Sequence, residues 1–222
     1  SFSFQRDFGS YVMENVLFKI SFPAEFHAQT AVECALTLHG MEREKLDSVE
    51  KIHQIKRILI STHESAIRII DKTGPLHNPA DRDHCIQYMV AVGLLKGNLT
   101  AQDYEDEMAL DPRIDLLREK MVCEEYPSYT KDYLDPEKRS IANAIQVFYA
   151  DGSMSEKVAV EYPIGHKRRR EEGIPKLVDK FKTNLARQFD REKVAKILDI
   201  SLDQNTLEAT PVNDYVDLYW KG

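Results

Sequence analysis

The chain has 222 residues, of which 30 are lysine or arginine and 37 are aspartate or glutamate, so its formal net charge at pH 7 is −7. A domain that coats nucleic acid is generally basic, and this acidic balance argues against that class. No apolar stretch approaches the roughly 20 residues that a membrane-spanning helix requires. Length and composition favour a soluble globular protein with one large domain, or one domain with an appendage.

The three cysteines are spaced unlike the ligands of a zinc site or an iron–sulfur cluster, and their odd number does not indicate a disulfide framework. They are Cys34, Cys85 and Cys123. We expect buried free thiols and a reducing compartment, which either the bacterial cytoplasm or the mitochondrial matrix supplies. The chain also lacks a glycine-rich phosphate loop and a His-Glu-x-x-His motif, so it predicts no cofactor and no metal.

The first part of the chain carries a strand pattern and then a helix pattern. Residues 16–22 predict a short strand that Pro23 ends. Residues 24–38 predict a helix because alanine and leucine recur near one face, and Gly40 is a plausible stop for it. The charged residues 41–54 predict a surface connection.

A second strand and a long helix are expected next. Residues 55–62 predict the strand, and residues 71–76, which include Gly-Pro, predict a loop. Asn78-Pro79 is typical of an N-cap followed by proline at the first helical position. The helix that starts there is almost wholly apolar from Met89 to Leu95 and ends at Gly97, so we expect it to be buried.

The remaining patterns mix helices with one hairpin. Residues 100–121 predict two short helices divided at Asp111-Pro112. Residues 143–162 alternate in polarity on both sides of Asp151-Gly152 and predict a β-hairpin. Residues 165–173 predict a basic loop. Strands and helices do not alternate regularly as βαβ units, which favours an α+β fold.

The C-terminal part is predicted to be helical. Apolar side chains recur every four residues at Leu177, Phe181, Leu185 and Phe189, which is typical of an amphipathic helix. Two short helices are expected after Asp190.

The first candidate site joins Lys19 and His27. A cation at the end of a strand and an imidazole at the start of a helix can face one pocket, and a helix N-terminus favours an anion. The alternative is a surface lysine and a histidine that makes only local hydrogen bonds.

The second candidate site lies on the helix after Asn78. Asp81, His84 and Tyr88 are spaced at i, i+3 and i+7, so one helix would place them on one face, beside Gln87. A histidine–tyrosine pair could supply acid–base groups. The alternative is a hydrogen-bonded core histidine and a packed tyrosine.

The third candidate site is residues 164–170, in which His166 is followed by four consecutive cations that include Arg168 and Arg169. Arginine side chains suit carboxylates and phosphates, so the run could bind a polyanionic small substrate, and a nucleic-acid patch is conceivable. The alternative is a solvated charge run that Glu171 and Glu172 partly neutralise. From the residues alone, the chain is an α+β domain with a candidate anion pocket.

Four segments together resemble a known family, the 2-methylcitrate dehydratases of the MmgE/PrpD superfamily. The resemblance covers nearly the whole chain and is more specific than a short motif. The segments are residues 11–27, residues 72–88, residues 139–144 and residues 161–166.

The resemblance implies a fold and a set of partners. Residues 1–170 would form a lid domain of mixed helices and antiparallel strands, and residues 171–222 a C-terminal helical segment. That segment would pack on an N-terminal all-helical domain that is absent from this chain, which corresponds to the C-terminal half of a typical member. A homodimer is implied, with no nucleic acid and no membrane.

The resemblance also implies the dehydration of 2-methylcitrate, a tricarboxylate, to 2-methyl-cis-aconitate in propionate breakdown, without an iron–sulfur cluster. Lys19 would hold a substrate carboxylate and His27 would take part in proton transfer. His84 and Tyr88 are further catalytic candidates. His166, Arg168 and Arg169 are candidates for substrate binding, with the two arginines as carboxylate clamps. The alternatives are a cis-aconitate decarboxylase of the same superfamily and a non-catalytic lid or assembly domain that binds polyanions.

Overall fold

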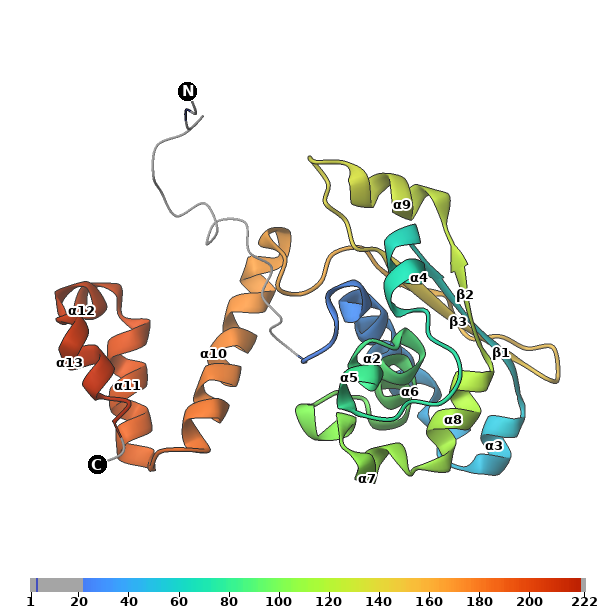
Figure 1. The fold of residues 1–222 in the computed structure, drawn as a ribbon, viewed down its shortest axis with the longest axis horizontal. Coiled ribbons are helices and arrows are strands. Elements are labelled where there is room, and N and C mark those ends of the chain that lie inside the picture. The colour runs from blue at the N-terminus through green and yellow to red at the C-terminus, as the bar shows by residue number, and fades with distance from the viewer. Residues whose placement is uncertain (1–2, 4–21, 221–222) are drawn as a thin grey trace. The chain divides into compact units, whose positions relative to one another are not determined.

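A four-stranded sheet forms one layer of the first of two units into which the chain divides (Figure 1). The computed structural model describes residue 3 and residues 22–220. The first unit ends at Arg170 and the second begins at Glu171. Lys19 and the strand predicted at 16–22, apart from Phe22, lie outside the described residues.

The sheet has the order β2-β1-β3-β4, with β1 at Ile55–Thr62, β2 at Met121–Glu125, β3 at Asn143–Tyr149 and β4 at Val158–Val160. The strand predicted at 55–62 and the hairpin of β3 and β4 are confirmed. The α+β class is also confirmed, but the sheet is mixed because β2 pairs with β1 in parallel. A parallel neighbour needs a long crossover, and the helical segments between β1 and β2 provide it.

Helices α2 (Gln29–Glu42) and α6 (Ile86–Lys96) pack against each other, and the sheet and these helices share one core. A 3₁₀ turn at Phe26–Ala28, η1, leads directly into α2. The expectation that Gly40 stops this helix is wrong, because α2 continues to Glu42. Cys34 on α2 is buried, as predicted, and burial raises the pKa of its thiol to about 12.

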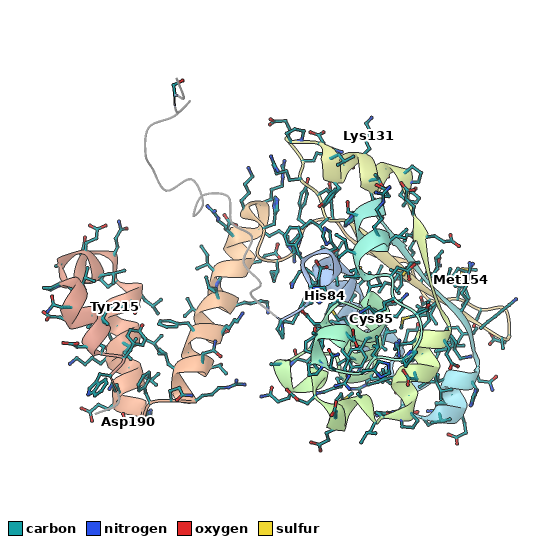
Figure 2. The ribbon with its side chains drawn as sticks, viewed as in Figure 1. His84, Cys85, Lys131, Met154, Asp190 and Tyr215 are labelled. Atoms are coloured by element: carbon teal, nitrogen blue, oxygen red, sulfur yellow. The ribbon has the colours of Figure 1, made fainter. Side chains whose placement is uncertain are left out.

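The single helix predicted after Asn78 is instead two helices, α5 (Pro79–Asp83) and α6, separated at His84 and Cys85 (Figure 2). The Asn78 side chain caps α5 as predicted. Cys85 then has an extended backbone, with φ −128° and ψ 105°, and its thiol donates to the carbonyl oxygen of Lys72. This tertiary contact anchors the break, which the apolar pattern did not reveal.

The other helical segments of the first unit are short, and two expectations change. The connection predicted at 41–54 contains a helix, and residues 100–121 hold three helical segments before β2 begins. These segments are η2 (Arg43–Lys45), α3 (Val49–His53), α4 (Glu64–Ile70), η3 (Ala101–Tyr104), α7 (Asp106–Ala109), α8 (Pro112–Glu119) and α9 (Pro127–Leu134).

The second unit is helical, with α10 at Arg170–Ala186, α11 at Arg191–Leu202, α12 at Gln204–Ala209 and α13 at Val212–Asp217. Three helices therefore follow Asp190, where two were predicted. The predicted basic loop is also wrong, because a 3₁₀ turn at Lys167–Arg169, η4, leads straight into α10.

The second unit has a small apolar core. Leu185, Val194 and Ile197 are its buried residues, with Phe181 and Phe189 packed against them. None of the helices in the described part of the chain combines the length and apolarity that a bilayer crossing requires.

Two glycines inside α2 and α6 have opposite surroundings. A Cβ atom added at Gly93 would lie 2.9 Å from the Cβ atom of Ala35, so α2 and α6 approach each other closely there. A Cβ atom added at Gly40 would have no neighbour within 4 Å. The first glycine serves the packing of two helices, whereas the second only lowers helix propensity.

We therefore expect Gly93→Ala to lower the free energy of unfolding by about 1–3 kcal/mol, the usual cost of overpacking. Gly40→Ala, the matched control, should raise it by about 0.5–1 kcal/mol because alanine loses less backbone entropy. Urea unfolding of both variants beside the parent protein measures the difference. A Gly93→Ala variant as stable as the parent would contradict the close helix approach.

Candidate active site

Buried polar side chains gather where β1 ends and β3 begins. The pairing of β1 with β3 places Ser61 opposite Ala144, so the next residues, Thr62 and Asn143, lie beside each other. The Asn143 side-chain N–H₂ donates to the carbonyl oxygen of His27 at 2.9 Å. This bond fastens η1 to the start of β3 and brings His27 to the end of the sheet.

His27 is held at both ring nitrogens. Its Nδ1 lies 2.9 Å from Glu25 Oε1, and its Nε2 lies 3.1 Å from the hydroxyl oxygen of Tyr133 on α9. A carboxylate only accepts, so Nδ1 carries the proton and Nε2 of the neutral ring is an acceptor. Tyr133 then donates to Nε2, and the three side chains form a continuous carboxylate–imidazole–phenol chain.

Glu25 is ionised in this arrangement. Burial alone would raise the pKa of its carboxyl, but hydrogen bonds from the side chain and backbone of His27 outweigh burial and lower that pKa. The backbone N–H of His27 donates to the second carboxylate oxygen of Glu25 at 2.8 Å. An ionised partner at Nδ1 fixes the tautomer of His27 and makes Nε2 a better base.

His63, directly after β1, is a second imidazole in the same cluster. Its ring stacks on Tyr133 with centroids 4.5 Å apart and planes 7° apart, and lies 5.2 Å from the ring of His27. Its Nδ1 accepts from the backbone N–H of Ala66 at 3.4 Å and so caps α4. Burial, with a contribution from nearby His27, lowers the pKa of His63 to about 4, so it is neutral at pH 7.

Several polar atoms here are buried and have no hydrogen-bond partner among the described residues. They include Thr62 Oγ1, His63 Nε2, Ser140 Oγ and Asn143 Oδ1. A buried polar group without a partner costs about 1–3 kcal/mol, so most proteins avoid it. Their concentration on the segments that meet His27 indicates a place where a polar ligand or water completes the hydrogen bonding.

The structure separates His84 and Tyr88, the catalytic candidates of the second site. His84 is exposed at the end of α5, and its charge adds a small part to the lowering of the Glu25 pKa, so it lies near this cluster. Tyr88 is buried in α6, and its hydroxyl donates to the carbonyl oxygen of Asp103 at 2.6 Å. Because the chain breaks between the two residues, they do not share one helix face as predicted.

The cationic residues of the third candidate bind the protein itself. Arg169 donates to a carboxylate oxygen of Glu33 at 2.8 Å, and Arg168 donates to the carbonyl oxygen of Glu137 at 2.8 Å. His166 is buried, its ring lies 4.5 Å from that of Tyr162 with the planes tilted by 33°, and its Nδ1 accepts from the backbone N–H of Arg168 at 3.2 Å. These contacts order the segment, while carboxylate binding by it stays a prediction.

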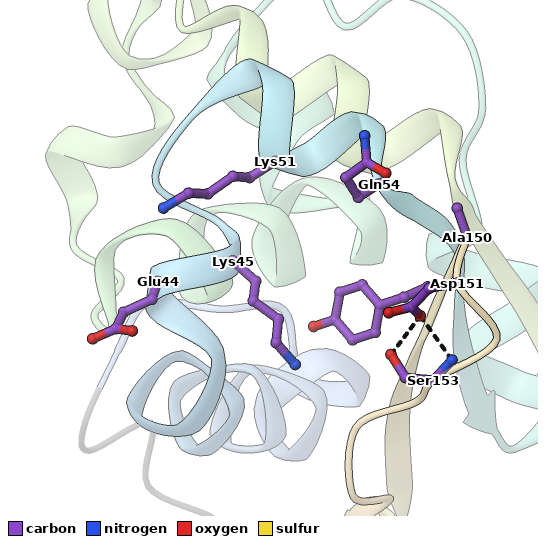
Figure 3. A pocket seen from close by; sticks show the side chains of 8 residues that line it. Glu44, Lys45, Lys51, Gln54, Ala150, Asp151 and Ser153 are labelled. Atoms are coloured by element: carbon purple, nitrogen blue, oxygen red, sulfur yellow. Dashed lines mark hydrogen bonds between the residues drawn. The ribbon is translucent and has the colours of Figure 1, made fainter.

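Two cavities of the first unit lie apart from the histidines. One, of about 320 Å³, is lined by Lys45, Lys51 and Tyr149 among others (Figure 3). The pairing of Ile55 with Tyr149 puts it at the opposite end of β1 from His63. The other, of about 400 Å³, is lined by Lys72–Pro75 and α8 residues. Among the described residues, no group of three or more His, Cys, Asp or Glu side chains is arranged to hold a metal ion.

Comparison with known proteins identifies the family. The MmgE/PrpD C-terminal domain matches residues 22–205. The chain belongs to the MmgE/PrpD family. An Escherichia coli (strain K12) relative named 2-methylcitrate dehydratase is 64% identical over 220 residues, which is 99% of this chain and 45% of that protein.

Other relatives of this MmgE/PrpD chain come from a second bacterium and a yeast. A 2-methylcitrate dehydratase of Cupriavidus necator is 62% identical over 98% of the chain and 44% of its own length. A mitochondrial 2-methylcitrate dehydratase of Yarrowia lipolytica is 56% identical over 99% of the chain and 41% of its own length. The chain thus spans slightly less than half the length of these relatives.

Sequence reasoning found His27 in this MmgE/PrpD chain but missed its partners. Glu25 is two residues before His27 and could have been found, because the carboxylate of an N-cap residue accepts from the backbone two or three residues further along. Tyr133 is 106 residues from His27, and no local pattern marks it. His63 was missed because the apolar residues before it predict only a strand, and no local motif includes the histidine that follows.

His166 generates a prediction about acid stability. Burial, together with the cations Arg168 and Lys167, lowers its pKa to about 4 in the folded chain, whereas an unfolded histidine titrates near 6.5. The unfolded state therefore binds more protons between these values, and stability falls as the pH drops from about 6.5 toward 4. The slope from one such group is at most about 1.4 kcal/mol per pH unit.

We expect His166→Asn to flatten this acid limb while leaving stability above pH 7 little changed, because asparagine is also a good N-cap and does not titrate. Unfolding free energies of the parent and the variant from pH 4 to pH 8 provide the test. Parallel curves for the two proteins would rule out the buried neutral state of His166.

Proposed function

We propose that this chain forms the C-terminal part of a hydro-lyase that dehydrates 2-methylcitrate to 2-methyl-cis-aconitate, a step of the methylcitrate cycle of propionate breakdown. Relatives with 56–64% identity over 98–99% of the chain carry the name 2-methylcitrate dehydratase. The observation that carries the proposal is the chain Glu25–His27–Tyr133, which offers a fixed imidazole for proton transfer.

The reaction sets clear demands on the site. A proton leaves the carbon next to a carboxylate, the carbon–oxygen bond of the hydroxyl group breaks, and the hydroxyl departs as water after it gains a proton. The developing charge on the carboxylate must be stabilised, and the leaving group needs an acid. His27 can remove the proton from carbon, because its hydrogen bond to Glu25 leaves Nε2 as an acceptor and makes that nitrogen a stronger base.

The remaining roles follow from charge and position. We assign Lys19 to one substrate carboxylate, as the family resemblance implies. Tyr133 lies one hydrogen bond from any proton that His27 takes or gives. His84, exposed beside this cluster, and Tyr88 remain candidates for acid–base work. His166, Arg168 and Arg169 are the weaker candidates for substrate carboxylates, because other parts of the protein already occupy them.

We also propose that the active protein contains an N-terminal helical domain and forms a homodimer. The relatives are more than twice as long as the region that they share with this chain. The second unit has apolar side chains that it does not bury: Val212 and Val216, four residues apart on α13, are 80% and 59% exposed, and Trp220 is 74% exposed. Burial of such a stripe against helices is favourable.

The compartment follows the source of the protein. Bacterial relatives and a relative named mitochondrial both match the chain, so we propose the cytoplasm in a bacterium and the mitochondrial matrix in a eukaryote. The names of the relatives favour a dehydratase over a cis-aconitate decarboxylase.

The direct test is an assay of the full-length protein with 2-methylcitrate in the presence of a strong chelator. We expect ultraviolet absorbance to rise as the conjugated unsaturated tricarboxylate forms, since no iron–sulfur cluster is required. Product analysis separates the alternatives, because a decarboxylase acting on cis-aconitate would release carbon dioxide and itaconate. No product from either substrate would favour a non-catalytic lid.

The role of His27 gives a sharper expectation. His27→Ala in the full-length protein should lower kcat by about 10²–10⁴-fold, the usual contribution of a positioned acid–base group. Glu25→Gln should cause a smaller loss, because the imidazole remains but its ionised partner does not. His53→Ala is the matched control, since His53 is exposed at the end of α3. Near-normal turnover by His27→Ala would refute the assignment.

A further inference from the structure

We propose that His63 binds the substrate directly, by donating a hydrogen bond from Nε2–H to a carboxylate oxygen of the tricarboxylate. The inference rests on the dehydratase function proposed above and adds a residue that neither the sequence motifs nor the family resemblance singled out. His63 Nε2 is buried and has no hydrogen-bond partner among the described residues.

The protonation of the His63 ring follows from its contact with α4. The backbone N–H of Ala66 can only donate, so Nδ1 of His63, at 3.4 Å from it, must be the bare nitrogen. In a neutral imidazole the proton then sits on Nε2. The unpartnered atom is therefore a hydrogen-bond donor, and it needs an acceptor.

The position of the ring is fixed by its surroundings. The His63 side chain is fully buried, and Tyr133 stacks flat against one face at 4.5 Å. The cap on α4 holds one edge of the ring, so Nε2 on the other edge keeps one direction. Such a donor, fixed without an acceptor, costs free energy in the folded chain and is suited to a ligand that supplies one.

The charges around His63 explain why it stays neutral. The ionisable groups that face it are Glu25, the N-cap of η1, His27 from η1 and Tyr133 from α9. Two imidazoles 5.2 Å apart do not both carry a positive charge readily, because like charges at this distance repel. When His27 takes a proton during turnover, a second proton-accepting histidine would compete with it. A neutral His63 can bind the substrate while His27 exchanges a proton.

A carboxylate is the acceptor that best fits this donor. It is ionised at neutral pH and only accepts, and a hydrogen bond to a charged group is stronger than one to a neutral group. A tricarboxylate brings three such groups, and Lys19 can bind one of them. The other cationic candidates, Arg168 and Arg169, already donate to Glu137 and Glu33. A further donor is therefore needed for the remaining carboxylates. His63 supplies a further donor beside His27.

Two substitutions separate the donor from the cap. His63→Asn keeps an oxygen that can cap α4 but removes the donor at the position of Nε2. His63→Gln places an amide N–H₂ near that position. In the full-length protein we expect His63→Asn to raise KM for 2-methylcitrate by about 10- to 100-fold with a smaller change in kcat. His63→Gln should recover most of this loss, and the control His53→Asn should match the parent.

The outcomes distinguish this inference from the proposed function. If the parent turns over 2-methylcitrate and the KM of His63→Asn equals that of the parent, the role of His63 is refuted while the proposed function stands. An equal rise in KM in both His63 variants, with unfolding midpoints like that of the parent, would assign the effect to packing and also overturn it. If His63→Asn does not fold, recovery of the parental KM by His63→Gln supports the donor, and its failure overturns it.

Failure of the function itself has its own readout. If the parent shows no turnover, calorimetric binding of 2-methylcitrate to the same proteins decides. Binding that His63→Asn weakens by at least tenfold and His63→Gln retains supports the donor. Absence of binding to the parent, or equal binding to all three proteins, overturns it.

Discussion

The antiparallel pairing of β1 with β3 holds Ser61 opposite Ala144, and the polar end of the sheet depends on this register. Side chains on a strand alternate between two faces, so a shift of β3 by one residue would turn Ile145 away from the core face that it shares with Ile60. The same shift would turn Asn143 away from His27 and break the bond that fixes η1. The burial of isoleucine therefore also fixes the position of the imidazole.

The cluster combines one imidazole that has an ionised carboxylate partner with a second imidazole that has none. Glu25 is ionised and partners His27, while His63 beside them stays neutral because it is buried. Tyr133 touches both rings, through its hydroxyl on one and its face on the other. This division gives one group that can exchange a proton and one that can bind without doing so, which suits chemistry on a substrate with several negative charges.

The fold was predictable wherever one local signal dominated. The β-branched run of β1 and the Asp151-Gly152 turn of the hairpin were both found, as was the cap at Asn78. The break at Cys85 was missed because the cap at Asn78 and the apolar run after Cys85 together predict one helix, whereas the break is held by a contact with Lys72. The site was predictable only at His27, since Tyr133 and His63 reach it through the tertiary fold.

The link between His27 and Tyr133 also has a meaning for the order of folding. Glu25 and His27 are two residues apart, so their contact closes almost no loop and can form early. The bond to Tyr133 closes a loop of 106 residues. The entropic cost of closing this loop is offset only after β1, β2 and β3 have paired. Partly folded chains can hold the carboxylate–imidazole pair, but the complete three-residue chain belongs to the finished fold alone.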